Sequence, residues 1–246
     1  MDTVCMISKG QYTARLAEGP QDVARAQALR FAAFHGGVGR DCDGFDARCD
    51  HLLVEDAGTR ELVCTCRMLT LHSGAEIDTS YSAQFYDLSA LHGFEGPVVE
   101  MGRFCVHPAS KDGDILRVAW AALTQYVDAR GVTLLFGCTS FDGTEHAPYD
   151  DAFAVLKARH LAPARWLPRI KAPNVFRFAA RLRRKPDAKR AMQVMPPLLR
   201  TYLMMGGWVS DHAVVDPQMN TLHVFTGVEI GAIPDARKRL LRAVAG

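Results

Sequence analysis

Apolar positions recur at two different periods along this chain, and together they predict alternating helices and strands. Apolar residues at helical spacing predict an amphipathic helix over 21–35 and another after an acidic cap at Asp112 or Asp114. Gly36 and Gly37 are expected to end the first of these helices. Shorter helices are predicted over 151–160, 195–208 and 233–246.

Continuous or alternating apolar runs predict the strands. HLLVED (51–56) and ELVCTCRML (61–69) flank a turn-like tetrapeptide, which is typical of a β-hairpin. Further strands are predicted over 97–107, 132–138 and 221–230. The order of helix, hairpin, strand, helix, strand, helix predicts a mixed α/β chain with helices covering a sheet. Neither G-x-G-x-x-G nor a P-loop motif is present, so the pattern is not that of a dinucleotide-binding fold.

Length and composition indicate an ordinary globular protein, which we expect to be one domain over 1–246 with a basic C-terminal extension from about 161. The net charge of +2 hides an asymmetry. Residues 1–150 hold 12 lysines and arginines against 21 aspartates and glutamates, a net of −9; residues 151–246 hold 17 against 6, a net of +11. An acidic front and a basic back predict two surfaces with different partners.

The ends of the chain and the cysteines point to the cytoplasm. Residues 1–11 do not resemble a signal peptide, and no apolar run approaches the roughly 18 residues of a membrane span. Seven cysteines, an odd number, are expected to be reduced thiols. Cys64 and Cys66 form C-x-C with no second pair at zinc spacing, so no metal site is expected.

Glu100 is the first candidate for chemistry, because a carboxylate in an otherwise apolar strand is costly unless it is paired or functional. Arg103 follows three residues later and would need a bulge to reach the same face. The structural alternative is an ion pair between the two.

An acidic loop supplies the second candidate. Its residues are Asp43, Asp46 and Asp50, followed by His51. Such a loop could hold a cationic substrate or a metal, although the EF-hand spacing is absent; the alternative is a solvated loop. Arg30 and Arg67 lie among apolar residues, and each needs a buried anion that this loop could supply.

A basic stretch near the C-terminus is the third candidate. It comprises Arg159, Arg165, Arg169, Lys171, Arg177, Arg181, Arg183, Arg184 and Lys185. Acidic lipid head groups, an acidic carrier protein or nucleic acid would suit it, and a solvated face is the alternative. Interleaved aromatic residues would permit base stacking, but no nucleic-acid motif accompanies them, so nucleic acid is ranked last.

Other nucleophiles have weaker support. No G-x-S-x-G motif occurs, which disfavours a serine hydrolase. A cysteine–histidine nucleophile stays open, since Cys49 lies near His51 and Cys105 near His107.

The order and spacing of several motifs resemble a known family. These motifs are Arg30-x-x-x-Phe34, Asp43-x-x-Asp46, Cys49-Asp50-His51-Leu52-Leu53-Val54, Arg67, Glu100-x-x-Arg103-Phe104-x-Val106, Phe136-Gly137-Cys138-x-Ser140-Phe141 and Met195-Pro196-Pro197-Leu198-Leu199-Arg200-x-Tyr202, with Asp211 and Val215-Asp216. Together they are similar to the ornithine–acyl-carrier-protein N-acyltransferases, the lyso-ornithine lipid synthases of bacteria. This family is related to the acyl-homoserine lactone synthases. The resemblance runs from about residue 14 to about residue 230.

This resemblance implies a GNAT-like α/β fold, a twisted mixed sheet with a V-shaped splay flanked by helices. It also implies that a long-chain or 3-hydroxy fatty acyl group moves from acyl carrier protein to the α-amino group of L-ornithine, forming lyso-ornithine lipid. The same chemistry on glutamine or another amino acid, an acyl-homoserine lactone synthase and an inactive carrier- or lipid-binding module stay open as alternatives.

The donor implied is a carrier protein with its own phosphopantetheine, so no bound cofactor is expected. Coenzyme A-binding relatives have a Gly-rich loop before the helix that follows this strand. Here that place is taken by residues 107–114, which cannot cradle a pyrophosphate in the usual way.

The resemblance also assigns residues to the site. Glu100 and Arg103 are implied as catalytic, with Glu100 as general base. Substrate binding is implied for Arg30, Phe34, Asp43, Asp46, Asp50, His51 and Arg67. Backbone N–H groups of Phe104, Cys105 and Val106 are candidates for the oxyanion and acyl thioester. The acyl tunnel is expected at Leu135, Phe136, Ser140 and Phe141. The basic stretch, through Arg165, Arg169, Lys171, Arg181, Arg183, Arg184 and Lys185, is expected to dock the carrier protein and to contact anionic inner-membrane lipid.

Overall fold

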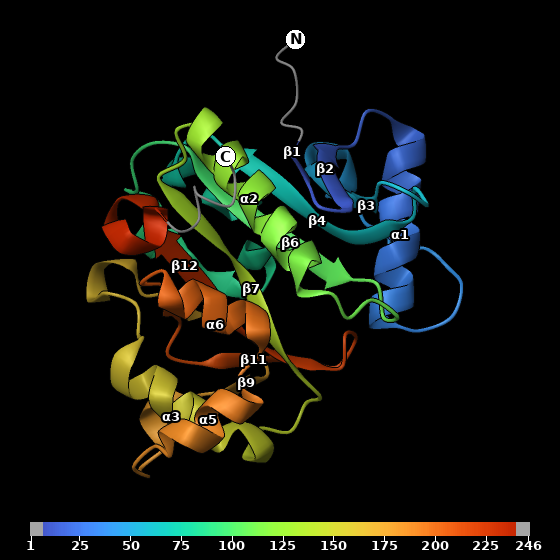
Figure 1. Ribbon diagram of the computed structural model, residues 1–246. Helices are drawn as coiled ribbons and strands as arrows, with labels where there is room; N and C mark the ends of the chain where they lie inside the picture. Colours follow the sequence, from blue (N-terminus) through green and yellow to red (C-terminus); the bar gives the residue numbers. More distant parts are fainter. Residues whose placement is uncertain (1–6, 240–246) are drawn as a thin grey trace. The chain divides into compact units, whose positions relative to one another are not determined.

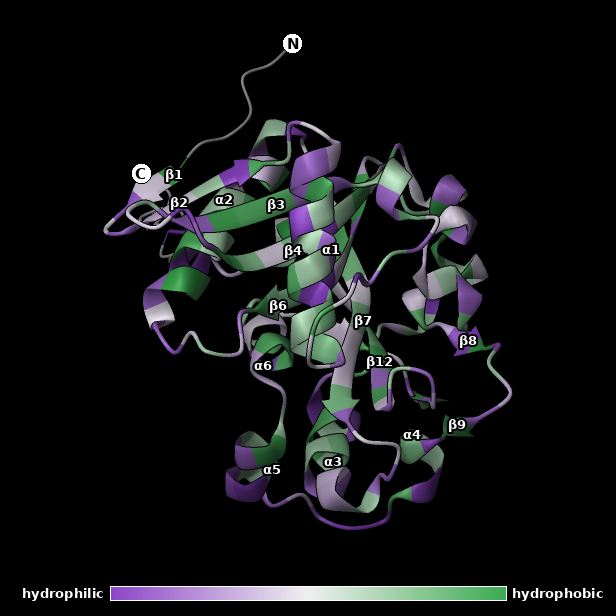
Figure 2. Cartoon of the chain, turned by 90° about the vertical axis from the view of Figure 1, so that its right-hand side faces the viewer, coloured by the Kyte–Doolittle hydropathy of each residue, from purple (hydrophilic) through white to green (hydrophobic). Residues whose placement is uncertain are grey.

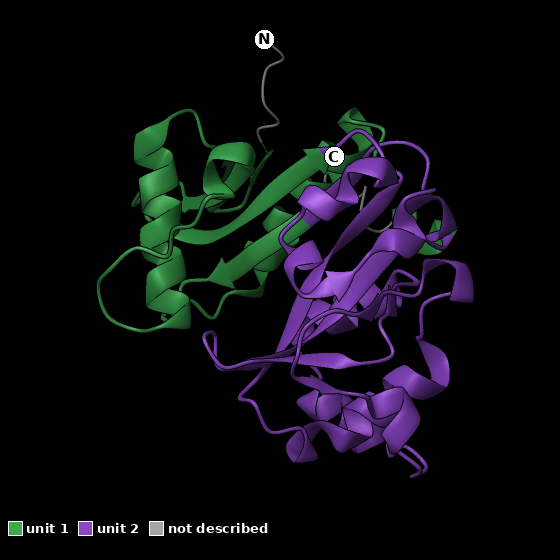
Figure 3. Ribbon diagram, turned by 180° about the vertical axis from the view of Figure 1, so that it is seen from behind, with its two compact units in different colours: residues 1–70, 101–132, 235–246 green, residues 71–100, 133–234 purple. Residues whose placement is uncertain are grey.

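The computed structural model describes residues 7–239, and the chain divides into two compact units (Figure 3). Unit 1 takes in residues up to 70, residues 101–132 and those from 235 onward, and unit 2 takes in residues 71–100 and 133–234. Strand β6 (Val98–Val106) begins in unit 2 and ends in unit 1, so it contributes backbone to both.

Unit 1 is built on antiparallel strands (Figure 1), in the order β1-β2-β3-β4 with the second half of β6 next to β4. The strands are β1 (Ile7–Lys9), β2 (Tyr12–Leu16), β3 (Asp50–Asp56) and β4 (Leu62–Leu71). The predicted hairpin is confirmed, with Leu52 opposite Cys66 and Val54 opposite Cys64. The hairpin of β1 and β2 was not predicted from the sequence.

Both long helices belong to unit 1 and confirm the helical periodicity. Helix α1 (Pro20–Phe34) is followed by Gly36 and Gly37, whose φ angles of 74° and 75° end it. Helix α2 (Gly113–Ala129) packs on β1, β2 and β3, and its N-cap is Asp112, whose carboxylate accepts a hydrogen bond from the Asp114 amide. In Figure 2, α1 carries alternating hydrophilic and hydrophobic residues, whereas β3 is hydrophobic in its middle and hydrophilic at both ends.

Unit 2 holds the first half of β6, which pairs with β7 in parallel, and an antiparallel series that continues β7-β12-β11-β9. Its strands are β5 (Tyr86–Asp87), β7 (Leu134–Asp142), β8 (Arg169–Ile170), β9 (Val175–Phe176), β10 (Trp208–Val209), β11 (Ala213–Asp216) and β12 (Thr221–Glu229). The strand predicted over 132–138 extends to Asp142, because β7 pairs with β12 along its whole length. The final predicted strand, 221–230, is β12.

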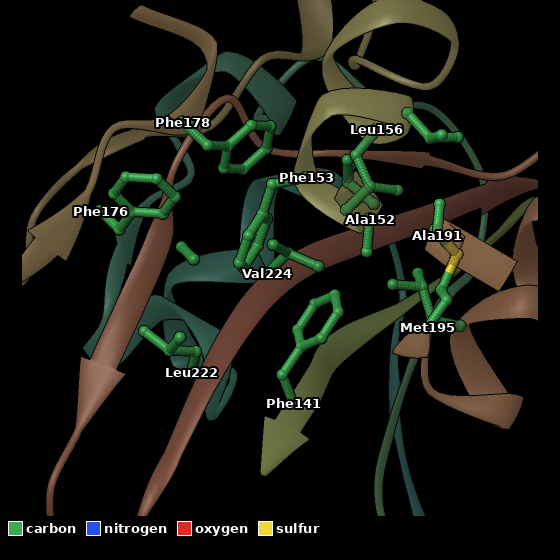
Figure 4. Close-up of a cluster of buried hydrophobic side chains, with 14 residues drawn as sticks. Phe141, Ala152, Phe153, Leu156, Phe176, Phe178, Ala191, Met195, Leu222 and Val224 are labelled. Carbon is green, nitrogen blue, oxygen red and sulfur yellow. The ribbon is translucent and has the colours of Figure 1, made fainter. Parts of the chain in front are cut away.

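Helices of unit 2 cover one face of β7 and β12. They are α3 (Asp150–Arg159), α4 (Phe178–Arg181), α5 (Ala188–Val194) and α6 (Pro197–Met204). Phe141 of β7 and Val224 of β12 pack against Phe153 of α3, and Figure 4 shows these side chains turned toward one another. Because side chains alternate along a strand, Phe136 lies on the opposite face of β7, where it stacks on Phe225 at 5.7 Å between ring centroids.

Short 3₁₀ helices connect these elements. They are η1 (Asp46–Arg48), η2 (Gly74–Thr79), η3 (Ser82–Gln84), η4 (Ser89–Leu91), η5 (Ala147–Tyr149), η6 (Ala164–Trp166) and η7 (Ile230–Ala232). Residues 235–239 of the predicted C-terminal helix are helical, and the rest of it lies outside the described residues. Within the described part of the chain, no helix combines the length and apolar character needed to cross a membrane. The architecture is the expected mixed sheet, largely antiparallel and flanked by helices.

Candidate active site

The acidic loop and two buried arginines form a charged network in unit 1. Arg30 projects from α1, is 1% exposed and binds Asp46 in a bidentate way, with both nitrogen–oxygen distances at 2.8 Å. The same guanidinium also donates to the backbone carbonyl of Asp41. Arg67 of β4 donates to Asp43 at 2.6 and 2.8 Å and to Asp46 at 2.7 Å. The prediction that Arg30 and Arg67 find their anions in this loop is therefore confirmed.

Arg103 of β6 completes the network. Its Nε donates to Asp41 at 3.0 Å, and its Nη2 lies 3.5 Å from Asp43. Its φ angle of 54° is in the left-handed region, which a non-glycine residue in a strand adopts only where surrounding contacts hold it. Three arginines thus face three aspartates, so the network is balanced in charge. Asp41 was outside the site predicted from the sequence.

These contacts change how the acids of the loop ionise. Burial works to raise the pKa of Asp46, but hydrogen bonds from Arg30, Gln27 and Arg67 outweigh it and lower the pKa. Burial opposes ionisation of Asp43 in the same way, and hydrogen bonding to Arg67 lowers its pKa. Both side chains are therefore carboxylates at neutral pH and serve as fixed negative charges.

His51 and Asp50 are neighbours in β3 but have different surroundings. The buried His51 places Nε2 3.0 Å from the Asp46 carbonyl, and burial lowers its pKa, so the ring is neutral at pH 7. Asp50 accepts from Tyr126 Oη at 2.7 Å and from Arg130 at 3.2 Å. Its partners thus lie on α2 and just after it.

Phe34, predicted to bind substrate, is the last residue of α1, and its side chain is 37% exposed.

Glu100 lies in the part of β6 that belongs to unit 2, opposite Phe136 of β7, where the parallel ladder ends. The side chain is buried. Its Oε2 accepts from the Tyr81 amide at 2.7 Å, and its Oε1 accepts from the Ser82 amide at 2.7 Å and from Ser82 Oγ at 2.5 Å. These donors, just before and within η3, were missed by the sequence analysis, since backbone N–H groups leave no signature in a sequence.

The backbone of β6 offers only some of the predicted oxyanion donors. The His107 amide donates to the Val63 carbonyl at 2.8 Å, so His107 points its N–H toward β4. Amides alternate in direction along an antiparallel pair, so that of Cys105 also faces β4, and those of Phe104 and Val106 face the other edge. The direction of the Cys105 amide disfavours it as an oxyanion donor, while Phe104 and Val106 stay candidates for that role.

The Cys105 thiol is a poor nucleophile at neutral pH. Burial raises its pKa to about 12, which keeps it protonated at neutral pH. The Cys105 and His107 pair left open by the sequence is disfavoured on that ground.

The predicted acyl tunnel cannot contain all four of its residues on one face. The register of β7 with β12 is regular, so Leu135 and Phe141 lie on one face and Phe136 and Ser140 on the other. Phe141 is part of the core under α3, and Ser140 is exposed. Phe136 and Ser140 share the face of Glu100, and Phe136, opposite Glu100 in the ladder, is the buried one of the two. The acyl tunnel stays a prediction.

The basic stretch is exposed in unit 2, but its cations differ in their contacts. Arg184 pairs with the buried Asp151 at 2.9 Å, and Lys171 Nζ donates to the Ala83 carbonyl at 2.6 Å. Arg165 lies over the Trp166 ring, 5.0 Å from its centroid. The other predicted docking residues are exposed side chains: Arg169, Arg181, Arg183 and Lys185. In the part of the chain that the structure describes, no three His, Cys, Asp or Glu side chains are grouped so as to hold a metal ion.

Known proteins share sequence with most of this chain. A family model described as an acetyltransferase (GNAT) domain matches residues 29–121. A curated L-ornithine N(alpha)-acyltransferase of Rhodobacter capsulatus is 34% identical, and the match covers 92% of this chain and 93% of that relative. A protein of the same name from Rhizobium meliloti is 30% identical, with 89% of this chain and 80% of the relative covered.

Solved structures share the fold at lower identity. FeeM, an N-acyl amino acid synthase from uncultured soil microbes, has a TM-score of 0.53 at 10% identity, covering 91% of this chain and 94% of its own. TofI in an apo form has a TM-score of 0.50 at 15% identity, covering 96% and 99%. These likenesses show that the chain has a GNAT-like fold.

Proposed function

The chain belongs to the L-ornithine N(alpha)-acyltransferases, and we propose that it transfers an acyl group from a thioester to the α-amino group of L-ornithine. The observation that carries this proposal is the 34% identity to a relative of that name across 92% of the chain. The same relatives favour ornithine over glutamine and over the substrate of an acyl-homoserine lactone synthase.

In the proposed reaction, the α-ammonium group loses a proton and its nitrogen attacks the thioester carbonyl. The N–C bond forms, the C–S bond breaks, and the thiolate leaves and takes up a proton. Glu100 is proposed to accept the proton of the amine, directly or through a water molecule. Its three hydrogen bonds to Tyr81 and Ser82 support this role, because they hold the carboxylate in a fixed orientation.

The exposed edge of the charged network is proposed to bind the acceptor. Asp43 is the most exposed of the three aspartates, at 28% against 10% for Asp41 and 7% for Asp46. Arg103, at 14%, is the most exposed of the three arginines. We assign the δ-ammonium of ornithine to Asp43 and the α-carboxylate to Arg103, while Arg30, Arg67, Asp46 and His51 hold the loop in place.

The start of α2 supports an acyl carrier protein as donor rather than coenzyme A. A helix N-terminus binds a pyrophosphate through unoccupied amides and a positive dipole. Here Asp112 already accepts from the Asp114 amide, and its carboxylate also accepts from Tyr12 Oη at 3.1 Å. Two acidic side chains at this end, Asp112 and Asp114, would repel a pyrophosphate.

The exposed cations of the basic stretch are proposed to dock this donor. Acyl carrier protein is acidic, and Arg181, Arg183 and Lys185 present a complementary charge. The same cations would favour peripheral contact with anionic lipid when a single-chain lyso-ornithine lipid is released.

One set of incubations tests the proposal. We expect the protein, given 3-hydroxyhexadecanoyl-acyl carrier protein and L-ornithine, to form N-acyl-ornithine, detected by mass spectrometry, and to use the coenzyme A thioester and other amino acids poorly. Glu100→Gln should reduce kcat by about 100-fold or more, because a general base contributes that much. Glu95→Gln, the same change at an exposed position of unit 2, is the control. Full activity of Glu100→Gln would remove Glu100 from the mechanism.

A further inference from the structure

Ser82 donates two hydrogen bonds to the Glu100 carboxylate, and Tyr81 donates one. It is fully buried, and its amide and hydroxyl both donate to Oε1, at 2.7 and 2.5 Å. A carboxylate oxygen has two lone pairs, so these two bonds use the acceptor capacity of Oε1. Because both Ser82 donors lie at Oε1, they direct an incoming proton toward Oε2, which accepts from the Tyr81 amide.

The Ser82 hydroxyl is itself held by a third residue. Its oxygen lies 3.4 Å from the sulfur of Cys138 on β7. A serine hydroxyl has a single proton, and Ser82 gives it to the ionised Glu100, so the Cys138 thiol must be the donor in the other contact. Hydrogen bonding therefore runs from Cys138 to Ser82 and from Ser82 to Glu100.

We propose that Ser82 is a positioning residue for the acyl transfer, and that it directs the proton of the amine to Oε2 of Glu100. Cys138 supports it by holding the hydroxyl in the rotamer that points at the carboxylate. This inference rests on the proposed role of Glu100 as general base. Both of its donors reach the same oxygen of Glu100, which is what fixes the orientation of the carboxylate.

The test compares variants in steady-state kinetics with 3-hydroxyhexadecanoyl-acyl carrier protein and L-ornithine. Ser82→Ala should lower kcat about tenfold, the effect of one hydrogen bond to a charged group, with the KM for ornithine changed less than twofold. Ser82→Thr keeps the hydroxyl and should restore kcat to within about threefold of wild type. Ser80→Ala is the matched control, since Ser80 is buried in the same segment but its hydroxyl accepts from the Ala83 amide.

Each outcome decides the inference. Equal losses in Ser82→Ala and Ser80→Ala, or no recovery in Ser82→Thr, would overturn it. If Ser82→Ala does not fold, Cys138→Ala should lower kcat a few-fold and Cys138→Ser should restore it, and no difference between these two would also overturn the inference. Loss of activity in Glu100→Gln together with a fully active Ser82→Ala would refute the positioning role alone, whereas a fully active Glu100→Gln would refute the proposed base.

Discussion

Asp46 is the residue on which the buried charges of unit 1 depend. It accepts from Arg30, from Arg67 and from Gln27 at 2.9 Å. Asp46→Asn keeps the shape and removes the charge, leaving Arg30 buried with less compensation. We expect the free energy of unfolding to fall by about 3 to 5 kcal/mol, measured by urea denaturation.

Asp50→Asn is the control for this loss. Asp50 pairs with Arg130 at the surface, and exposed pairs of this kind contribute about 1 kcal/mol or less. A similar loss in both variants would mean that the amide substitution itself, and not the buried charge, causes the effect.

His223 gives the protein a second pH dependence, separate from that of its carboxylates. Burial lowers the pKa of His223 to about 4; the charge of Asp216 opposes this shift and that of His212 adds to it. The unfolded chain, with a histidine pKa of about 6.5, takes up the proton first as the pH falls. The stabilisation is therefore complete above about pH 6.5 and is lost toward pH 4, a change of about 3 kcal/mol.

Urea denaturation at pH 7 and pH 4.5 measures this loss. His223→Gln should remove most of the fall in the free energy of unfolding between these two pH values. His72→Gln, at an exposed position, should keep the wild-type dependence. An unchanged slope in His223→Gln would assign the acid sensitivity to the carboxylates of unit 1, whose lowered pKa values act below about pH 4.

The rule that a buried charge needs an oppositely charged partner predicted some contacts and missed others. An arginine in an apolar pattern needs an anion, and Arg30 and Arg67 found theirs in the nearest acidic loop. The rule gave Glu100 a side-chain partner in Arg103. The structure describes backbone and hydroxyl donors from the 81–82 segment for Glu100, and acidic-loop acceptors for Arg103. Backbone N–H groups are identical at every position, so no sequence pattern identifies the two amides that bind Glu100.

At the scale of elements, α2 depends on its cap. The Asp112 carboxylate accepts from the Asp114 amide and ties the helix to β2 through Tyr12. We expect Asp112→Ala to reduce the free energy of unfolding by about 1 to 2 kcal/mol in urea denaturation, the usual contribution of an N-cap. Asp114→Ala removes only an exposed ion pair with Arg117 and should cost about half of that or less, so a larger loss in this variant would contradict the assignment of the cap.

Elements with a strong period were predicted well and short strands were not. Helix α2 presents a continuous apolar face, and the apolar residues of α1 recur at helical spacing over 15 residues; the bounds of both agree with the prediction within a residue or two. Strand β2 does alternate, with Tyr12, Ala14 and Leu16 buried, but five residues next to a three-residue strand give a weak signal. Strand β7 continues past Gly137 only because β12 supplies a partner, which is a property of the tertiary structure.

At the scale of the whole molecule, the acidic and basic parts of the sequence do not coincide with the two compact units. The chain passes between the two units at residues 70, 100, 132 and 234, so unit 2 contains both acidic and basic segments. The basic extension expected from about 161 is part of a unit that already includes residues 133–160. Composition cannot reveal such a division, because it depends on which strands pair. The single domain expected over 1–246 stays a prediction.

The basic stretch nevertheless makes a prediction that depends on net charge. Charge reversal of Arg181, Arg183 and Lys185 to Glu would replace three positive charges of the proposed docking surface with three negative ones, a net change of −6. We expect the KM for acyl carrier protein to rise at least tenfold with kcat changed less than twofold, because screened charges govern encounter more than chemistry. The wild-type KM should also rise with salt, and that of the variant should not.

Reversal of Lys9, Lys111 and Arg117 in unit 1 changes the net charge by the same amount and is the control. An equal rise in KM there would assign the effect to overall charge rather than to this surface. Pelleting with vesicles that contain anionic lipid distinguishes the second proposed partner: binding lost in the first variant and kept in the control would place lipid on the same cations. Lipid binding unchanged in both would separate the membrane contact from the basic stretch.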